Sequence, residues 1–174
     1  MRRLLLGLTI ALFAAGSPAN AALPVGAKAP NFTTMGAVGG KSFRFELGRQ
    51  LRKGPVVLYF FPKAFTSGCT AEAHAFSEAI AKFRRAGAQV VGMSADDLPT
   101  LRKFSIEECR SAFPVATASP ATITAYDVAL KKAPGLTDRT SYVIDRRGRI
   151  VMVHSDMDFS QHVAKTLAAV RRLR

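Results

Sequence analysis

Short, continuous apolar runs alternate along the chain with longer stretches of helical periodicity. Residues 56–61 and 89–93 are apolar runs typical of strands that are buried on both faces. Between them, from Cys69 to about Gly87, apolar residues recur every three or four positions, which predicts an amphipathic helix. Alternation of strand and helix indicates a parallel sheet that is covered on both faces.

The second half of the chain predicts further elements of both kinds: a helix from Asp96 or Asp97 to about Arg110, a strand over 115–117, a helix over 121–126, strands over 142–144 and 150–153, and a last helix from about Ser160. The turn signal at 145–148 joins the last two strands as an antiparallel hairpin. Residues 22–40 are rich in Gly, Pro and Ala and are expected to be irregular. We therefore predict one α/β domain with a central mixed sheet and helices on both faces.

The N-terminus has the features of a secretory signal peptide. Arg2 and Arg3 precede an apolar stretch over 4–15, and Ala19-Asn20-Ala21 provides the small residues that a signal peptidase requires. The stretch is too short for a stable membrane span, so an uncleaved anchor is the less favoured interpretation. We expect a signal peptide over 1–21, a domain over 22–174, and export to the periplasm or beyond the cell, with no stable membrane span after cleavage.

The chain is strongly basic, with a formal net charge of +13. Such a surplus favours anionic surroundings such as nucleic acid, an envelope polymer or a membrane surface. However, the basic residues are distributed over every segment, without an aromatic-studded patch or zinc-finger spacing. We therefore expect a solvated basic surface and no nucleic-acid partner.

Candidate chemistry centres on one of the two cysteines. Cys69 stands where the first buried strand gives way to its helix, and the positive end of a helix dipole favours the nucleophilic thiolate. Thr66 can turn its hydroxyl toward the sulfur or a bound oxyacid, and Pro62 ends the strand and helps to keep water from the pocket. The competing interpretation is a plain structural disulfide between Cys69 and Cys109.

The segment over 61–72, Phe-Pro-Lys-Ala-Phe-Thr-Ser-Gly-Cys-Thr-Ala-Glu, resembles the active-site segment of the peroxiredoxins, in particular their bacterioferritin comigratory protein or peroxiredoxin Q branch. Residues 25–32, 91–96 and 139–144 resemble other segments of that family. The resemblance implies a thioredoxin fold without a cofactor. It also implies a thiol-dependent peroxidase that reduces hydrogen peroxide and organic hydroperoxides through a sulfenic acid.

By this resemblance Cys69 is the peroxidatic cysteine, Pro62 and Thr66 complete its pocket, and Arg139 binds the peroxide oxygen. Attack on an O–O bond develops negative charge on the leaving oxygen, which a fixed guanidinium stabilises. The implied partners are a peroxide and a thioredoxin-like or small-thiol reductant. We expect a monomer or weak dimer.

The chain departs from the family where a resolving cysteine frequently lies five residues after the peroxidatic one, because His74 occupies that position. We expect His74 to form a solvated ion pair with Glu78, and no metal site with the other histidines. Cys109 is the possible resolving cysteine, on the helix that follows residue 97. A buried spectator thiol and a permanent bridge remain alternatives for it.

Two other classes of function compete with a peroxidase. Thiol–disulfide exchange catalysts usually carry Cys-x-x-Cys, whereas the position three residues after Cys69 is Glu72. A non-catalytic envelope-binding module would leave Cys69 with an ordinary, slow thiol.

Overall fold

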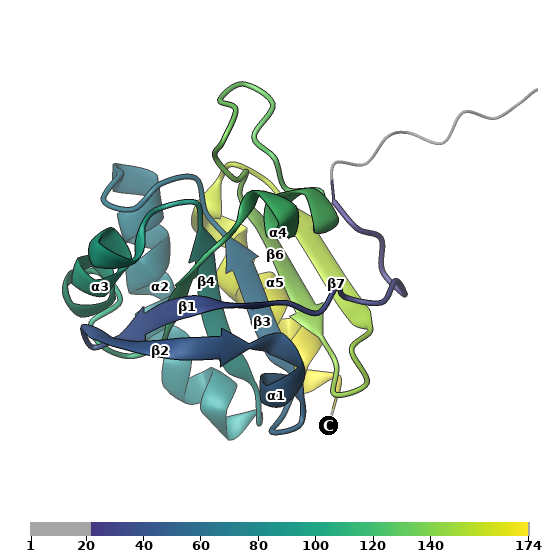
Figure 1. The fold of residues 1–174 in the computed structure, drawn as a ribbon. Coiled ribbons are helices and arrows are strands. Elements are labelled where there is room, and N and C mark those ends of the chain that lie inside the picture. Colours follow the sequence, from purple (N-terminus) through teal and green to yellow (C-terminus); the bar gives the residue numbers. More distant parts are fainter. Residues whose placement is uncertain (1–21, 174) are drawn as a thin grey trace, which may run out of the picture.

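The computed structural model describes residues 22–173 and contains a seven-stranded sheet in the order β2-β1-β5-β4-β3-β6-β7 (Figure 1). β3, β4 and β5 are parallel, while β6 and β7 on one side and β1 and β2 on the other add antiparallel pairs. The predicted mixed sheet with helices on both faces is therefore confirmed. The predicted signal peptide lies outside the described residues.

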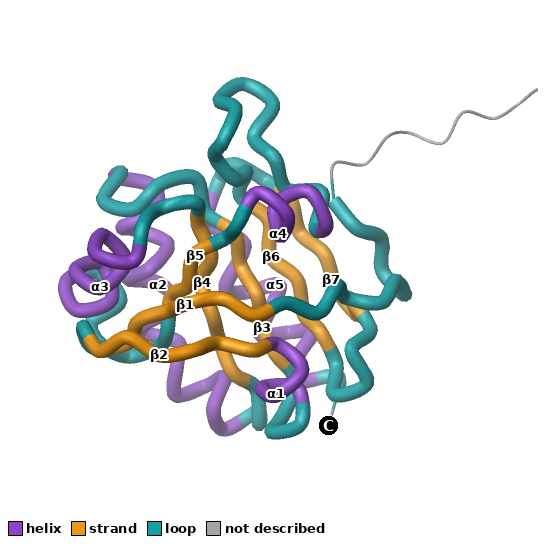
Figure 2. The backbone as a smooth tube through the Cα atoms, viewed as in Figure 1, coloured by secondary structure: helices purple, strands orange, loops and turns teal. Residues whose placement is uncertain are grey.

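The elements follow along the chain as β1 (Thr33–Val38), β2 (Lys41–Glu46), α1 (Leu47–Leu51), β3 (Val56–Phe60), α2 (Ser67–Arg85), β4 (Gln89–Ser94), α3 (Leu98–Glu107), β5 (Val115–Thr117), α4 (Pro120–Ala125), β6 (Thr140–Ile144), β7 (Ile150–Ser155), a 3₁₀ turn (Phe159–Gln161) and α5 (His162–Arg171) (Figure 2). Within residues 22–173, no helix combines the length and apolar character that crossing a bilayer demands.

β3 lies in the middle of the sheet and explains why its sequence is apolar at every position. Val57 and Tyr59 point into the core cluster that α2, α3 and α5 cover. Val56 and Leu58 point to the other face, into the cluster that includes residues of α1. Because successive side chains of a strand alternate between faces, a strand covered on both sides needs apolar residues throughout.

The expectation of an irregular segment over 22–40 is wrong for its second half. β1 and β2 form an antiparallel hairpin whose turn is Gly39-Gly40, with φ of +54° and +74°. A Gly-Gly pair between two alternating segments is a hairpin signal, because both turn positions need left-handed backbone. The abundance of glycine and alanine obscured that signal.

α3 is shorter than its sequence pattern predicts. Asp97 caps its first turn, as expected, but the helix ends at Glu107. Arg110 and Ser111 have φ of +51° and +54°, which a right-handed helix does not allow. Cys109 consequently lies in the turn after α3 rather than on the helix itself.

Candidate active site

Cys69 lies in the first turn of α2, directly after the loop that follows β3. Its side chain is only 2% exposed and its thiol is free. The thiol therefore lies near the positive end of the α2 dipole and is almost completely shielded from water. The preceding Gly68 permits close packing here, because a Cβ at that position would lie 3.2 Å from Arg139 Nη2.

Arg139 reaches Cys69 from the neighbouring strand. It immediately precedes β6, whose first residue, Thr140, pairs with Phe60 at the end of β3. This antiparallel register brings the arginine beside the start of α2. Arg139 Nη2 donates a hydrogen bond to Cys69 Sγ at 3.5 Å, and Nε donates to the carbonyl oxygen of Met157 at 3.0 Å.

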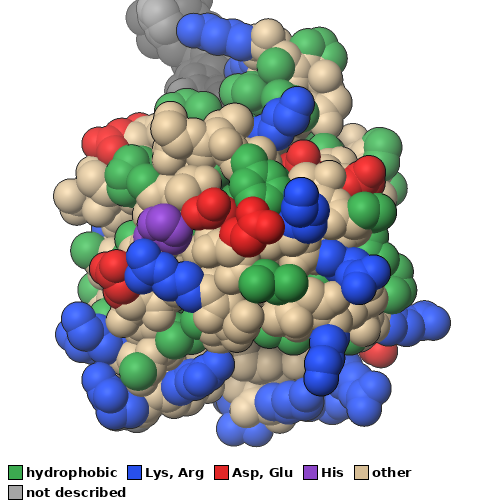
Figure 3. Space-filling view, turned by 90° about the vertical axis from the view of Figure 1, so that its left-hand side faces the viewer, with side chains coloured by type: hydrophobic (Ala, Val, Ile, Leu, Met, Phe, Trp, Pro, Cys, Tyr) green, Lys and Arg blue, Asp and Glu red, His purple; other side chains and the backbone are tan. Residues whose placement is uncertain are grey.

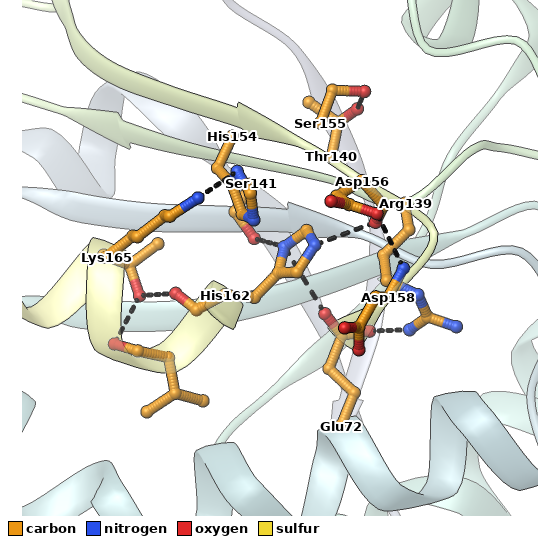
Figure 4. A network of polar contacts seen from close by, with 12 residues as sticks. Glu72, Arg139, Thr140, Ser141, His154, Ser155, Asp156, Asp158, His162 and Lys165 are labelled. Carbon is orange, nitrogen blue, oxygen red and sulfur yellow. Dashed lines mark hydrogen bonds and ion pairs between the residues drawn. The ribbon is translucent and has the colours of Figure 1, made fainter. Parts of the chain in front are cut away.

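Glu72, which lies one helical turn after Cys69 in α2, holds the remaining side of the Arg139 guanidinium. Its carboxylate is fully buried and accepts a hydrogen bond from Arg139 Nη1 (Figure 4). Burial raises the pKa of Glu72 to about 8, while the charge of Arg139 acts in the opposite direction. In the sequence, Glu72 stands out only as the residue at the place of a second cysteine. Its helical spacing of three from Cys69 is the signal that could have placed it in the site.

His162 approaches the same carboxylate from the first turn of α5. Its Nδ1 lies 3.7 Å from Glu72 Oε1, an oxygen that has no hydrogen-bond partner among the described residues. Nδ1 also lies 2.8 Å from Ser141 Oγ, and Nε2 lies 2.9 Å from the carbonyl oxygen of Asp156. Because a carbonyl can only accept, Nε2 carries the ring hydrogen and Nδ1 accepts from the hydroxyl.

Complete burial decides the charge of His162. The loss of solvation lowers the pKa of the imidazole to about 4, so the ring is neutral near pH 7. The sequence pattern gave no reason to connect this histidine with Cys69. The fold does so by packing the start of α5 against α2.

Pro62 and Thr66 frame the loop that leads from β3 to Cys69. Pro62 is half-buried at the end of the strand, as expected. The hydroxyl of Thr66 donates to the carbonyl oxygen of Lys63 at 3.0 Å and so stabilises the loop. Asp96 Oδ2 accepts the N–H of Ala64 at 2.7 Å and holds the loop from the other side.

Cys109 is fully buried and belongs to the same core cluster as Cys69. Both thiols are free, so the two residues do not form a permanent bridge here. Burial raises the pKa of the Cys109 thiol far above its ordinary value, and the adjacent Glu108 adds to the effect. The Cys109 thiol is therefore protonated and unreactive while it stays in the core.

Several polar contacts hold the turn that carries Cys109 against α2, and two of them join side chains. His74 Nε2 lies 2.8 Å from Glu108 Oε2, and Arg110 Nη1 lies 3.2 Å from Glu78 Oε1. The predicted ion pair between His74 and Glu78 is therefore wrong. Each side chain instead reaches across to the turn after α3, which runs alongside the helix and offers partners of opposite charge.

Comparison with known proteins gives consistent results. Residues 25–153 match the model of the AhpC/TSA family. The chain is 33% identical over 121 residues to a chloroplastic peroxiredoxin Q of Populus jackii, and the alignment covers 68% of this chain and 56% of that relative. It is also 33% identical over 128 residues to a putative peroxiredoxin of Mycobacterium tuberculosis, and this alignment covers 71% of this chain and 82% of the relative.

Solved structures resemble the fold over most of its length. The crystal structure of peroxidoxin BcpB from Mycobacterium tuberculosis has a TM-score of 0.74 and 31% identity, and covers 86% of this chain and 97% of its own. That of PrxQ from Xylella fastidiosa has a TM-score of 0.76 at 22% identity, and covers 87% of this chain and 97% of its own. The second likeness concerns the fold alone.

Proposed function

The chain belongs to the AhpC/TSA family and to its peroxiredoxin Q branch, whose members are thiol-dependent peroxidases, and we propose that it reduces peroxides with a thiolate at Cys69. The observation that carries this proposal is the hydrogen bond from Arg139 Nη2 to Cys69 Sγ in the first turn of α2. A guanidinium and a helix N-terminus both favour the negative sulfur. Glu72 takes the place at which a dithiol exchange catalyst carries its second cysteine.

The first step is an attack of the thiolate on one oxygen of a hydroperoxide. An S–O bond forms, the O–O bond breaks, and the leaving oxygen departs with the electron pair and takes a proton to become water or an alcohol. Cys69 is left as a sulfenic acid. Negative charge moves from sulfur to the leaving oxygen during this step, and the N–H groups of Arg139 are held in place to receive it. Glu72 and the Met157 carbonyl oxygen orient the guanidinium beforehand.

We further propose that Cys109 resolves the sulfenic acid. Its thiol attacks the Cys69 sulfur, an S–S bond forms, and the hydroxyl of the sulfenic acid leaves as water. Because the Cys109 thiol is buried and protonated, the turn after α3 must open before it can react. The left-handed backbone at Arg110 and Ser111 strains this turn, which favours its opening. A thioredoxin-like or small-thiol reductant would then return the disulfide to two thiols.

Peptide mass mapping after treatment with one equivalent of hydrogen peroxide tests both proposals. We expect a peptide pair linked through Cys69 and Cys109, within a monomeric chain, and the loss of both free thiols. A sulfenic or sulfinic acid at Cys69 with a free Cys109 would support the peroxidase and exclude Cys109 as its resolving residue. Oxidation confined to Cys109 would contradict the assignment of Cys69.

We also propose that the protein is exported after cleavage behind Ala21. The support is the order of charged, apolar and small residues over 1–21, which is typical of a secretory signal. N-terminal sequencing of the protein from the cell envelope should begin at Ala22. Intact Met1 on protein recovered from the cytosol would contradict export.

A further inference from the structure

The fold gathers basic side chains that are distant in the sequence at the end of the molecule opposite Cys69. They lie around α1, at the end of α2, in the turn between β6 and β7, and at the end of α5. All of them are exposed, and together we call them the basic pole: Arg49, Arg52, Lys53, Lys82, Arg84, Arg85, Arg146, Arg147, Arg149, Arg171 and Arg172. Figure 3 shows a concentration of Lys and Arg along this lower end of the molecule.

Contacts between these segments show that they form one continuous surface. Arg146 Nη2 donates to the carbonyl oxygen of Arg52 at 3.2 Å, which ties the β6–β7 turn to the loop after α1. Lys53, Arg147 and Leu173 line the same surface hollow, so the end of α5 joins them. The basic residues of the pole are thus scattered in the sequence but clustered in space.

The positive charge of the pole is not neutralised within the protein. The ion pairs of residues 22–173 include no member of the basic pole. Asp145 is the carboxylate that lines the hollow, and its Oδ1 accepts the backbone N–H groups of Arg147 and Arg149 at 2.9 and 2.8 Å. Several arginines of the pole donate to backbone carbonyl oxygens, which do not neutralise their charge, so the positive charge stays at the exposed surface, where like charges repel one another.

We propose that the basic pole docks the protein on an anionic phospholipid surface. Such a surface presents many negative groups in a plane, and each Lys or Arg held near it adds to binding. Leu173, which is 38% exposed beside the hollow, supplies an apolar side chain that can enter the headgroup layer. Single-stranded nucleic acid is less favoured, since the described residues expose no aromatic ring at this end on which a base could stack.

Docking in this way leaves the candidate active site free. α2 runs from Cys69 to the basic pole at Arg85, and a helix of that length spans about 24 Å at 1.5 Å per residue. Cys69 consequently lies at the end of α2 that is remote from the lipid surface. The protein could meet peroxides and a soluble reductant there while bound.

Vesicle co-sedimentation of the full chain tests the proposal. The readout is the binding gained when neutral phosphatidylcholine vesicles are replaced by vesicles containing phosphatidylglycerol, because the apolar stretch over 4–15 is common to every sample. Arg146→Glu with Arg147→Glu should weaken that gain at least about tenfold. Lys131→Glu with Lys132→Glu, on the exposed hairpin at the other end, makes the same charge change and should have a clearly smaller effect.

The additional binding to phosphatidylglycerol vesicles should also fall steeply between about 0.05 and 0.5 M salt, because salt screens the attraction between exposed charges. Equal losses in the two double variants would overturn the assignment to the basic pole. So would a parent protein that binds both kinds of vesicle equally, or one that binds a short single-stranded oligonucleotide through the same arginines more tightly than it binds phosphatidylglycerol vesicles. Peroxide reactivity of the Arg146→Glu, Arg147→Glu variant should match that of the parent, so failure of the docking proposal is separable from failure of the peroxidase.

Discussion

Arg139 donates to Cys69 from a guanidinium whose other nitrogens are already engaged by Glu72 and by the carbonyl oxygen of Met157. A side chain with three simultaneous partners keeps one orientation. The proposed oxyanion donor is therefore in place before a peroxide arrives, and no energy is lost in turning it during the reaction.

Replacing Arg139 should slow the reaction with peroxide strongly. For Arg139→Met we expect a loss of about 10²–10³ in the rate of Cys69 oxidation, by analogy with the removal of one oxyanion donor. Arg139→Lys keeps the charge but cannot span three partners, so its rate should be intermediate. Stopped-flow measurement of thiol oxidation gives the rates. Circular dichroism checks that each variant still folds although the buried Glu72 has lost its arginine partner. Arg110→Met, on the surface, is the matched control and should react as the parent does.

Thr66 should matter through the loop that it stabilises. Thr66→Val removes the hydrogen bond to the carbonyl oxygen of Lys63, so the loop before Cys69 loses a contact worth about 1 kcal/mol. We expect slower peroxide reduction with a small change in the unfolding midpoint. Thr66→Ser keeps the hydroxyl and should restore most of the rate. If the serine variant is as slow as the valine variant, the hydroxyl is not the feature that counts.

The contacts that hold the turn after α3 should limit the resolving step. Glu108→Gln weakens the contact with His74 beside Cys109. Partly exposed pairs are worth about 0–1 kcal/mol, so opening of the turn should become at most about fivefold more frequent. Disulfide formation after a peroxide pulse should accelerate by that factor, with less sulfinic acid at Cys69 by mass spectrometry. Glu107→Gln, whose side chain has no such partner among residues 22–173, is the control. An equal acceleration in both variants would reject this mechanism.

The buried His162 should make the stability of the fold depend on pH. Its pKa falls from 6.5 in the unfolded chain to about 4 in the fold, so the unfolded state binds a proton first as the pH decreases. This contribution is complete above about pH 6.5 and is lost as the pH falls toward 4, by up to about 3 kcal/mol. Glu72 acts with the opposite sign, because its raised pKa favours the fold at low pH and costs stability as the pH rises from 4.5 to about 8.

The variant His162→Gln separates the two effects, since Glu72 titrates in both proteins while glutamine does not titrate. Urea unfolding between pH 4 and pH 7 should show that the parent loses stability relative to the variant on acidification. Parallel profiles would show that His162 does not carry this pH dependence.

The central elements of the fold could be predicted because their sequence pattern and their burial coincide. The apolar run of β3 and the amphipathic α2 need no further information, and Cys69 follows from their junction. The β1–β2 hairpin was missed because both strands are only partly buried and their apolar pattern is weak. The early end of α3 depends on left-handed backbone at Arg110 and Ser111, which no apolar periodicity reveals.

The site shows the same division between local and long-range information. Cys69, Pro62 and Thr66 belong to one segment, so a sequence motif identifies them together. Arg139 lies far away in the sequence, and only the resemblance of residues 139–144 to a peroxiredoxin segment assigned it to the site. The position of His162 beside Glu72, by contrast, results from the packing of α5 on α2 across 90 residues of chain, and no local signal records it.

The most direct test of the account is the rate at which hydrogen peroxide oxidises the reduced protein when each cysteine is replaced in turn. Stopped-flow mixing under identical conditions compares Cys69→Ser, Cys109→Ser and the parent, with circular dichroism to confirm that each variant is folded. We predict that Cys69→Ser loses the fast reaction completely. Cys109→Ser should keep the parent rate for the first oxidation and accumulate sulfenic acid at Cys69. A Cys69→Ser variant that consumes peroxide at the parent rate would contradict the claim that Cys69 is the nucleophile.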